Sequence, residues 1–164
     1  MGTRHLIEVK LDEKTYVAQY GQWDGYPSGQ GATILKFLRG SDMEIFKDNL
    51  RKTRFLSDKE IQNRWEECGA DPNDSMVGME IADKFNRKYP HLSRNCGAEV
   101  LGLIYNGKAT ELYNSSGFEK DTTFCEWYYT IDLDKNVLKV WDKEYPLDKL
   151  PTKDKFIKEL EDDN

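Results

Sequence analysis

The stretch EWYYTIDLDKNVLKVW, residues 126–141, decides the fold of this 164-residue chain. Apolar and polar residues alternate on both sides of the dipeptide Lys135-Asn136, a pattern typical of a β-hairpin with a two-residue turn. One face of this hairpin is apolar, and a lone hairpin is marginal in water, so another layer must cover that face. The cross-strand pairs that the turn predicts are Leu133 with Leu138 and Ile131 with Val140.

The opposite face of the same hairpin is polar. Carboxylates and hydroxyls follow each other there with a period of two, which suits the solvent side of a half-buried sheet. The set is also rich enough in polar groups to serve as part of a site, and both interpretations stay open. Its members are Glu126, Tyr128, Thr130 and Asp132.

A second hairpin lies near the start of the chain. Residues 7–11 and 16–20 alternate in the same way on either side of the turn DEK, residues 12–14. A turn centred on Glu13 sets Val9 opposite Val17 and Leu11 opposite Thr15. The same register places Thr3 roughly beside Trp23.

Helical periodicity and capping patterns fill the region between the hairpins and the C-terminal tail. Ser41 with Glu44, and Ser57 with Glu60, have the spacing of capping boxes. The segment 96–107 fits either a helix or a buried strand, and we favour the helix. The predicted helical segments are 31–40, 42–52, 58–68, 75–89, 96–107 and 152–164.

These elements predict one α+β domain over residues 1–164. The length suits a single core, and no break in composition marks a second domain. We expect an antiparallel sheet built from the N- and C-terminal hairpins, with the helices of residues 31–106 packed largely on one face.

Composition and charge exclude several function classes. The net charge is −6 with 33% charged residues, which disfavours generic binding to nucleic acid. No apolar run approaches the roughly 20 residues that span a bilayer, and MGTRHLIEV lacks the layout of a signal peptide. We therefore expect a cytoplasmic protein with no membrane contact, and a homo-oligomer stays open.

The cysteines and histidines give no metal or disulfide signature. Three cysteines at wide spacing, far in sequence from His5 and His91, predict free and mostly buried thiols and no metal or cofactor. A catalytic thiol is the alternative, with Cys96 or Cys125 as the candidate. The three cysteines are Cys68, Cys96 and Cys125.

The loop QWDGYPSGQG, residues 22–31, concentrates the candidate chemistry. A glycine-rich turn before a helix, with arginines nearby, suits an anion, and Trp23 and Tyr26 offer faces for a base or sugar. The loop is neither a P-loop nor a Rossmann fingerprint. In the alternative interpretation, Arg4 and Arg94 pair with carboxylates and only brace the loop. The expected ligand-binding residues are Thr3, Arg4, Trp23, Asp24, Tyr26, Ser28, Arg94 and Glu126, with Ser93 beside Arg94.

Four blocks of the chain carry a resemblance: MGTRHLIEV, YGQWDGYPSGQG, LSRNCGAEVL and FCEWYYTIDLD. They resemble an uncharacterised family of phage and bacterial genomes with relatives in fungi. Gln22 stands where many relatives have His, and Cys96 where many have Thr. The resemblance implies candidate positions and, for a phage-encoded chain, the host cytoplasm, but it implies no reaction.

Three function classes follow. The first is a binding module for a small anionic, nucleotide-derived ligand, which in a phage would sequester a host defence signal. The second is a hydrolase acting on such a ligand or on an amide, similar to N-terminal-nucleophile hydrolases, although removal of Met1 exposes Gly2 rather than Thr3. The third is an acidic inhibitor that acts by protein contact. We rank binding first.

Overall fold

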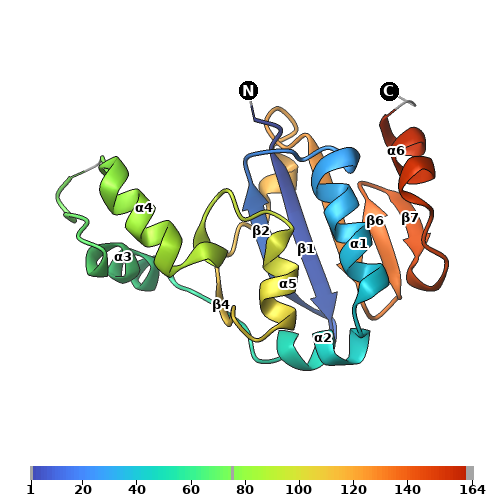
Figure 1. Cartoon of the computed structure of the whole chain (residues 1–164), viewed down its shortest axis with the longest axis horizontal. Helices are drawn as coiled ribbons and strands as arrows, with labels where there is room; N and C mark the ends of the chain where they lie inside the picture. The colour runs from blue at the N-terminus through green and yellow to red at the C-terminus, as the bar shows by residue number, and fades with distance from the viewer. Residues whose placement is uncertain (1, 75, 162–164) are drawn as a thin grey trace.

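The computed structural model describes residues 2–74 and 76–161 and shows a five-stranded sheet with helices beside it (Figure 1). The α+β class is confirmed. The strand order is β2-β1-β5-β6-β7. The strands are β1 (His5–Leu11), β2 (Lys14–Gly21), β5 (Trp127–Asp132), β6 (Val137–Val140) and β7 (Lys143–Pro146).

The two hairpins join through β1 and β5, and this central pair is parallel. The sheet is therefore mixed, and the expectation of a fully antiparallel sheet is wrong at this pair. Alternation within a hairpin fixes which face is apolar, but it carries no information on how two hairpins are oriented to each other. The long helical crossover between β2 and β5 supplies the connection that a parallel arrangement needs.

The N-terminal hairpin has the predicted pair Val9 with Val17. Its turn is tighter than expected, because Asp12 and Glu13 both adopt positive φ, 55° and 61°, and Leu11 pairs with Lys14. This geometry matches the two-residue turns that suit twisted hairpins.

The C-terminal hairpin is shifted by two residues from the predicted register. Ile131 lies opposite Leu138 and Tyr129 opposite Val140. The Asp132 side chain accepts hydrogen bonds from the backbone N–H groups of Asp134 and Lys135, at 3.1 and 3.0 Å, and so ends the ladder early. A shift of two keeps every side chain on its predicted face.

Six helices lie in the described residues, and each falls within or beside a predicted segment. The capping box of Ser57 and Glu60 is confirmed. Asp42, not Ser41, caps the second helix, since its carboxylate accepts from the N–H groups of Glu44 and Ile45. The helices are α1 (Ala32–Gly40), α2 (Met43–Leu50), α3 (Asp58–Glu67), α4 (Met79–Lys88), α5 (Glu99–Tyr105) and α6 (Lys153–Glu161).

Short elements connect these helices and strands. The helices predicted over 75–89 and 152–164 include Ser75 and residues 162–164, which lie outside the described residues. The first of these helices begins at Met79. In the described residues no helix is both long and apolar enough to cross a membrane. The short elements are β3 (Arg54–Phe55), β4 (Glu111–Leu112), η1 (Pro27–Gly31), η2 (Pro90–Leu92), η3 (Phe118–Lys120) and η4 (Leu147–Lys149).

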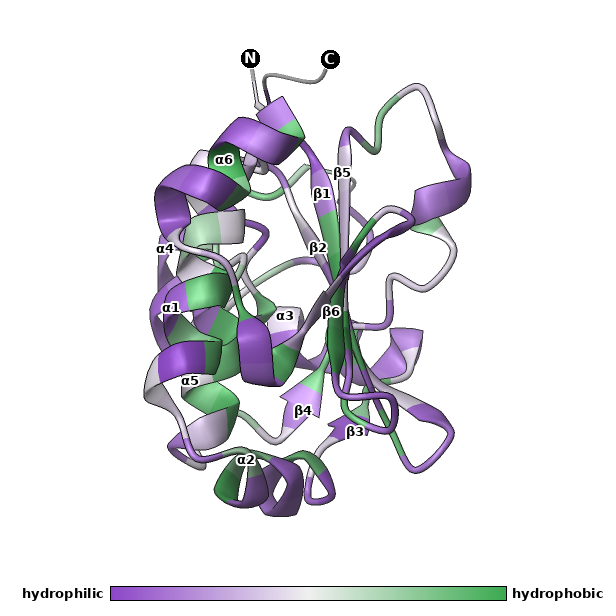
Figure 2. Cartoon of the chain, turned by 90° about the vertical axis from the view of Figure 1, so that its right-hand side faces the viewer, coloured by the Kyte–Doolittle hydropathy of each residue, from purple (hydrophilic) through white to green (hydrophobic). Residues whose placement is uncertain are grey.

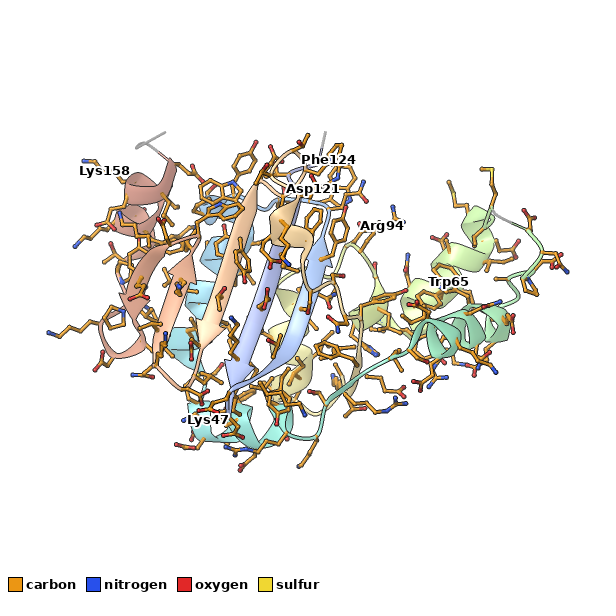
Figure 3. All side chains as sticks on the ribbon, turned by 180° about the vertical axis from the view of Figure 1, so that it is seen from behind. Lys47, Trp65, Arg94, Asp121, Phe124 and Lys158 are labelled. Atoms are coloured by element: carbon orange, nitrogen blue, oxygen red, sulfur yellow. The ribbon has the colours of Figure 1, made fainter. Side chains whose placement is uncertain are left out.

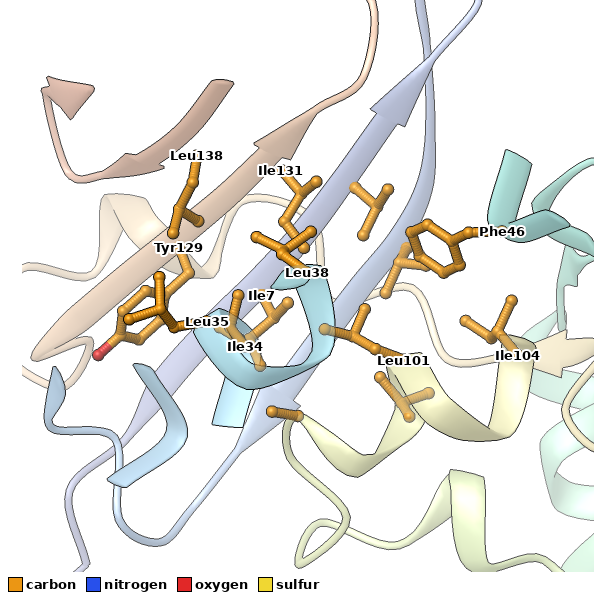
Figure 4. Close-up of a cluster of buried hydrophobic side chains, with 14 of the residues drawn as sticks. Ile7, Ile34, Leu35, Leu38, Phe46, Leu101, Ile104, Tyr129, Ile131 and Leu138 are labelled. Carbon is orange, nitrogen blue, oxygen red and sulfur yellow. The ribbon is translucent and has the colours of Figure 1, made fainter. Parts of the chain in front are cut away.

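The main core lies between one face of the sheet and a layer of helices (Figure 2). Side chains of α1, α2, α5 and α6 meet Ile7, Tyr129 and Ile131 there, and all three of these are fully buried (Figure 4). Each large apolar side chain buried in this way stabilises the fold by about 1.5–3 kcal/mol. We call this part of the molecule the body.

Helices α3 and α4 do not pack on the sheet, contrary to the expectation for residues 31–106. They extend beyond β2 as a helical pair with its own small core, which we call the arm, residues 56–92 (Figure 1). Trp65 of α3 stacks on Phe85 of α4 with ring centroids 3.7 Å apart and parallel planes. Helix α3 buries none of its own residues, so it lacks the wide apolar stripe that would pack on the sheet.

Ion pairs tie the arm to the short strands β3 and β4. The Arg54 guanidinium bonds the carboxylates of Glu60 and Glu111, at 2.6 and 2.7 Å, and Arg64 also reaches Glu111, at 3.0 Å. At the other side of the arm, the Tyr89 hydroxyl donates to the Glu67 carboxylate at 2.7 Å.

The second face of the sheet is partly covered rather than open. The Phe118 ring packs edge-on against Tyr20, and Thr130 is buried. The Tyr128 hydroxyl donates to the buried carboxylate of Glu8 at 2.7 Å, and burial raises the pKa of Tyr128. The solvated interpretation therefore fails for this part of the face, because residues far away in sequence cover it.

Candidate functional site

Backbone hydrogen bonds hold the loop 22–31 against the start of β1. The Gly25 N–H donates to the Thr3 carbonyl at 3.0 Å, and the Tyr129 hydroxyl donates to the Gly25 carbonyl at 2.6 Å. Asp24 adopts a φ of 56° and its carbonyl accepts from the Gln30 N–H at 2.8 Å. The loop thus has a defined conformation fixed by the body.

The Gln30 side chain clamps the loop to the approach to α5. Its amide N–H donates to the Trp23 carbonyl at 3.1 Å, and its oxygen accepts from the Ala98 N–H at 2.8 Å. A Cβ at Gly97 would lie 2.6 Å from that oxygen, and Gly97 also has a φ of 54°. Glycine is therefore required at this position.

His5 is fully buried beneath this loop. Gly21 makes room for its ring, since a Cβ there would lie 2.1 Å from a ring carbon. The ring lies beside the Thr3 backbone, but neither ring nitrogen reaches good hydrogen-bond geometry with a described residue. Burial lowers the pKa of His5 to about 4, although the Thr3 backbone and then the charge of Asp24 oppose the shift.

The two aromatic residues of the loop point outward. Trp23 is 45% and Tyr26 is 49% exposed, and neither lines any of the three cavities described below. The Arg4 guanidinium lies over the Phe124 ring, 5.3 Å from its centroid, while the Glu126 carboxylate accepts from the Arg4 backbone N–H at 3.2 Å. The predicted pairing of arginine and carboxylate side chains is therefore not formed at Arg4.

Ser28 lies apart from the other predicted residues. Its N–H donates to the Glu161 carboxylate at 3.0 Å. It lines an open groove of about 610 Å³ between α1 and the start of α6, beside Lys36, Arg39 and Lys153. A smaller hollow of about 440 Å³ lies next to α3.

Arg94 lies at a third place, in a cleft of about 830 Å³ between the body and the arm. Its guanidinium donates to the Gln22 side-chain oxygen at 3.3 Å, and its carbonyl accepts from the Gln22 N–H at 3.2 Å. Figure 3 shows Arg94 on the body and Trp65 on the arm. Among the described residues that line this cleft, Arg94 alone is a lysine, arginine, aspartate or glutamate.

Aromatic and amide side chains form the walls of the cleft. The Trp65 indole N–H donates to the Tyr113 hydroxyl. Burial raises the pKa of Tyr113, and this hydrogen bond and the charge of Arg94 oppose the shift. Asn86 and Asn95 add amides from opposite walls. The lining residues are Gln19, Tyr20, Trp65, Val77, Ala82, Asn86, Leu92, Ser93, Arg94, Asn95, Tyr113 and Ser115.

Gln19 lines this cleft, but its side-chain amide is buried. The residue is only 2% exposed, and its amide N–H donates to the His91 carbonyl at 3.3 Å, which fixes the orientation of the amide. Its side-chain oxygen has no partner among the described residues. A buried acceptor without a donor costs about 1–3 kcal/mol, and this oxygen lies too deep to contact a molecule in the cleft.

The three cysteines are buried, free thiols, as the sequence predicts. Burial raises the pKa of Cys96 to about 12 and that of Cys125 to about 11. Both thiols are therefore neutral near pH 7, whereas nucleophilic cysteines are thiolates. This environment does not favour the catalytic alternative.

Comparisons with family models, with curated proteins and with solved structures found no match. The resemblance described above stays a prediction.

The structure divides the predicted residues among three places and adds residues that the sequence interpretation missed. Arg94 and Ser93 line the cleft, Ser28 lines the groove, and the others lie at one end of the sheet. Gln19, Trp65 and Tyr113 were missed. Gln19 gave the one usable signal, since it is a polar residue at an inward-facing strand position.

Proposed function

We propose that the protein binds a small anionic molecule with a planar ring, of the nucleotide type, in the cleft between the body and the arm. The observation that carries the proposal is the composition of the cleft. A single arginine, aromatic side chains and the amides of Asn86 and Asn95 surround a volume of about 830 Å³. Cavities of this size, mostly apolar with a few convergent polar groups, are typical of ligand sites.

Each part of such a ligand has a complementary group. A phosphate suits the Arg94 guanidinium. Arg94 is exposed, and only one of its five N–H donors is used by the contact with Gln22. A ring suits the faces of Tyr20, Trp65 and Tyr113. The side-chain amides of Asn86 and Asn95 suit an amino or hydroxyl group of the ligand.

The proposal concerns binding, and in a phage setting it would make the protein a module that sequesters a nucleotide signal. Ser93 lines the cleft, but its hydroxyl already accepts from the Asn95 N–H at 3.1 Å. The neutral environment of Cys96 and Cys125 likewise supports retention of a ligand rather than attack on it.

Calorimetric titration with adenosine and guanosine monophosphates tests the proposal. We expect binding by the parent protein and a loss of about ten- to a hundredfold for Arg94→Ala, because a charge-assisted hydrogen bond contributes about 1.5–3 kcal/mol. Arg87→Ala is the matched control, since Arg87 is an exposed arginine of α4 outside the cleft lining. Equal binding by both variants, or no binding by the parent protein, contradicts the proposal.

Mass spectrometry of denatured, purified protein separates the function classes. A binding module releases an intact nucleotide-like molecule. A hydrolase releases product or nothing, and an inhibitor needs no ligand.

A further inference from the structure

The exposed aromatic residues of this protein gather at one end of the sheet. In the described part of the chain, eight large apolar side chains are exposed, and four of them are aromatic. All four aromatic residues lie in loops that precede β5 or follow β2 and β6. These strand ends lie at the same end of the sheet, because β1 and β5 are parallel. They are Trp23 (45% exposed), Tyr26 (49%), Phe124 (51%) and Trp141 (36%).

The extended segment Gly2–Arg4 joins them into one surface. A Cβ at Gly2 would lie 3.2 Å from the Trp23 ring, and the Thr3 carbonyl holds Gly25, the neighbour of Tyr26. The Arg4 guanidinium covers the Phe124 ring. Trp23 therefore contacts this segment at Gly2, and Phe124 contacts it through the Arg4 side chain.

Glu126 extends the same surface to Trp141. Its carboxylate accepts from the Arg4 N–H, and its carbonyl accepts from the Trp141 indole N–H at 3.3 Å. The Trp141 ring also packs edge-on against Tyr128. We call the residues 2–4, 22–26, 121–126 and 141–142 the sheet-end surface; Figure 3 shows Asp121 and Phe124 at this end.

Acidic residues surround these aromatic rings. Within the three loop segments of the sheet-end surface, every charged residue is a carboxylate, and each of them is exposed. Arg4 is the one cation of the surface, and it lies over Phe124. The carboxylates are Asp24, Asp121, Glu126 and Asp142.

We propose that the sheet-end surface docks a basic segment of another protein, one in which lysine or arginine alternates with apolar residues. Exposed tryptophan and tyrosine are the residues that most often dominate the energy of protein interfaces. Cations of the partner would contact both the carboxylates and the faces of the aromatic rings. The acidic charge argues against nucleic acid as the occupant.

The surface is suited to docking because its backbone is already fixed. Gln30 and Tyr129 hold the loop 22–31, and Thr3 holds Gly25. A fixed backbone lowers the conformational entropy that is lost on binding. The sheet-end surface meets the cleft only through the contact of Gln22 with Arg94, and neither Trp23 nor Phe124 lines the cleft, so variants of these two rings test the surface separately.

The test uses a labelled peptide of about ten residues in which arginine alternates with leucine, and fluorescence anisotropy at low salt. We expect the parent protein to bind it, and Trp23→Ala and Phe124→Ala each to weaken binding about ten- to thirtyfold, as interface hot spots do. Ile45→Ala is the matched control, because Ile45 is 46% exposed on α2, away from the sheet end. Circular dichroism checks that each variant folds.

A second pair of variants separates a built surface from the net charge of −6. Asp24→Asn combined with Asp121→Asn removes two charges and keeps the acceptors, and asparagine tolerates the positive φ of Asp24. Asp58→Asn combined with Glu66→Gln removes two charges from exposed positions of α3. We expect about a tenfold loss only for the first pair.

Three outcomes overturn the inference: no binding by the parent protein, equal losses for both charge pairs, or equal binding of a peptide with glutamate in place of arginine. Titration of Trp23→Ala with mononucleotide keeps the two proposals distinct. We expect that variant to bind mononucleotide like the parent protein, so failure of either proposal is seen independently of the other.

Discussion

The body and the arm of this protein are stabilised by different means. A continuous core between the sheet and four helices stabilises the body, together with a ladder of backbone hydrogen bonds. The arm has four buried side chains, one aromatic stack and ion pairs at its surface. Exposed ion pairs contribute little to stability, so we expect the arm to open at a lower free energy than the body. The cleft lies where the two parts meet.

The largest effect in this comparison should come from truncating a core phenylalanine in each part. Phe46→Ala in the body should reduce the free energy of global unfolding by about 3–5 kcal/mol, because Phe46 is fully buried in the main core. Phe85→Ala should instead lower the protection of α3 and α4 and leave β1 and β5 protected. Hydrogen exchange with mass spectrometry measures both. Loss of protection throughout the molecule in Phe85→Ala would show that the arm and the body unfold as one unit.

Acid should weaken the body through His5. The pKa of His5 is about 4 in the folded protein and 6.5 without perturbation, so the unfolded chain binds a proton first as the pH falls. Protonation of His5 leaves the free energy of unfolding unaffected above pH 6.5 and lowers it by about 3 kcal/mol between pH 6.5 and pH 4. Urea unfolding of the parent protein and of His5→Phe at several pH values measures the difference. If the two lose equal stability over that range, protonation of His5 is not the cause.

Tyr128→Phe should produce a smaller loss in the body. It removes the hydroxyl that donates to the buried Glu8 carboxylate, and an unsatisfied buried acceptor costs about 1–3 kcal/mol. Tyr26→Phe is the control, since Tyr26 is about half exposed and its loss of a hydroxyl should be neutral. Thermal unfolding compares them, and equal melting temperatures for the two variants would contradict the prediction.

The smallest effect should be the loosening of the arm by Glu111→Gln. This change removes the carboxylate that Arg54 and Arg64 share. We expect faster hydrogen exchange in α3, a reduced dependence of that exchange on salt, and no change in β1 or β5. Added salt should mimic the variant in the parent protein. Unchanged exchange in α3 would mean that the aromatic stack alone holds the arm.

The hairpins show how far local patterns extend. Alternation predicted both hairpins and their apolar faces, because the side-chain period of a strand is local. It did not predict that β1 and β5 are parallel, and it placed Ile131 opposite Val140 instead of Leu138. The register depended on the Asp132 side chain, whose hydrogen bonds end the ladder.

The candidate sites show the same division. The sequence predicts Arg94 as an anion-binding residue and singles out Trp23 and Tyr26 as unusual loop residues, because charge and aromatic character belong to the residues themselves. It grouped them in one site, whereas the structure places Arg94 in the cleft and the two rings at the sheet end. Arg94 and Trp23 are far apart in sequence, and no local pattern fixes the distance between such residues.

The sequence by itself determined the α+β class, the apolar faces of the hairpins, the capping box of α3 and the unpaired thiols, since each depends on neighbouring residues or on residue type. Tertiary structure alone decided that α3 and α4 leave the sheet and pack on each other, that Arg94 shares a cleft with Trp65 and Tyr113, and that Gly2–Arg4 contacts exposed rings. The physical reason is that these features arise from contacts between distant segments, whose free energies depend on how the whole chain packs.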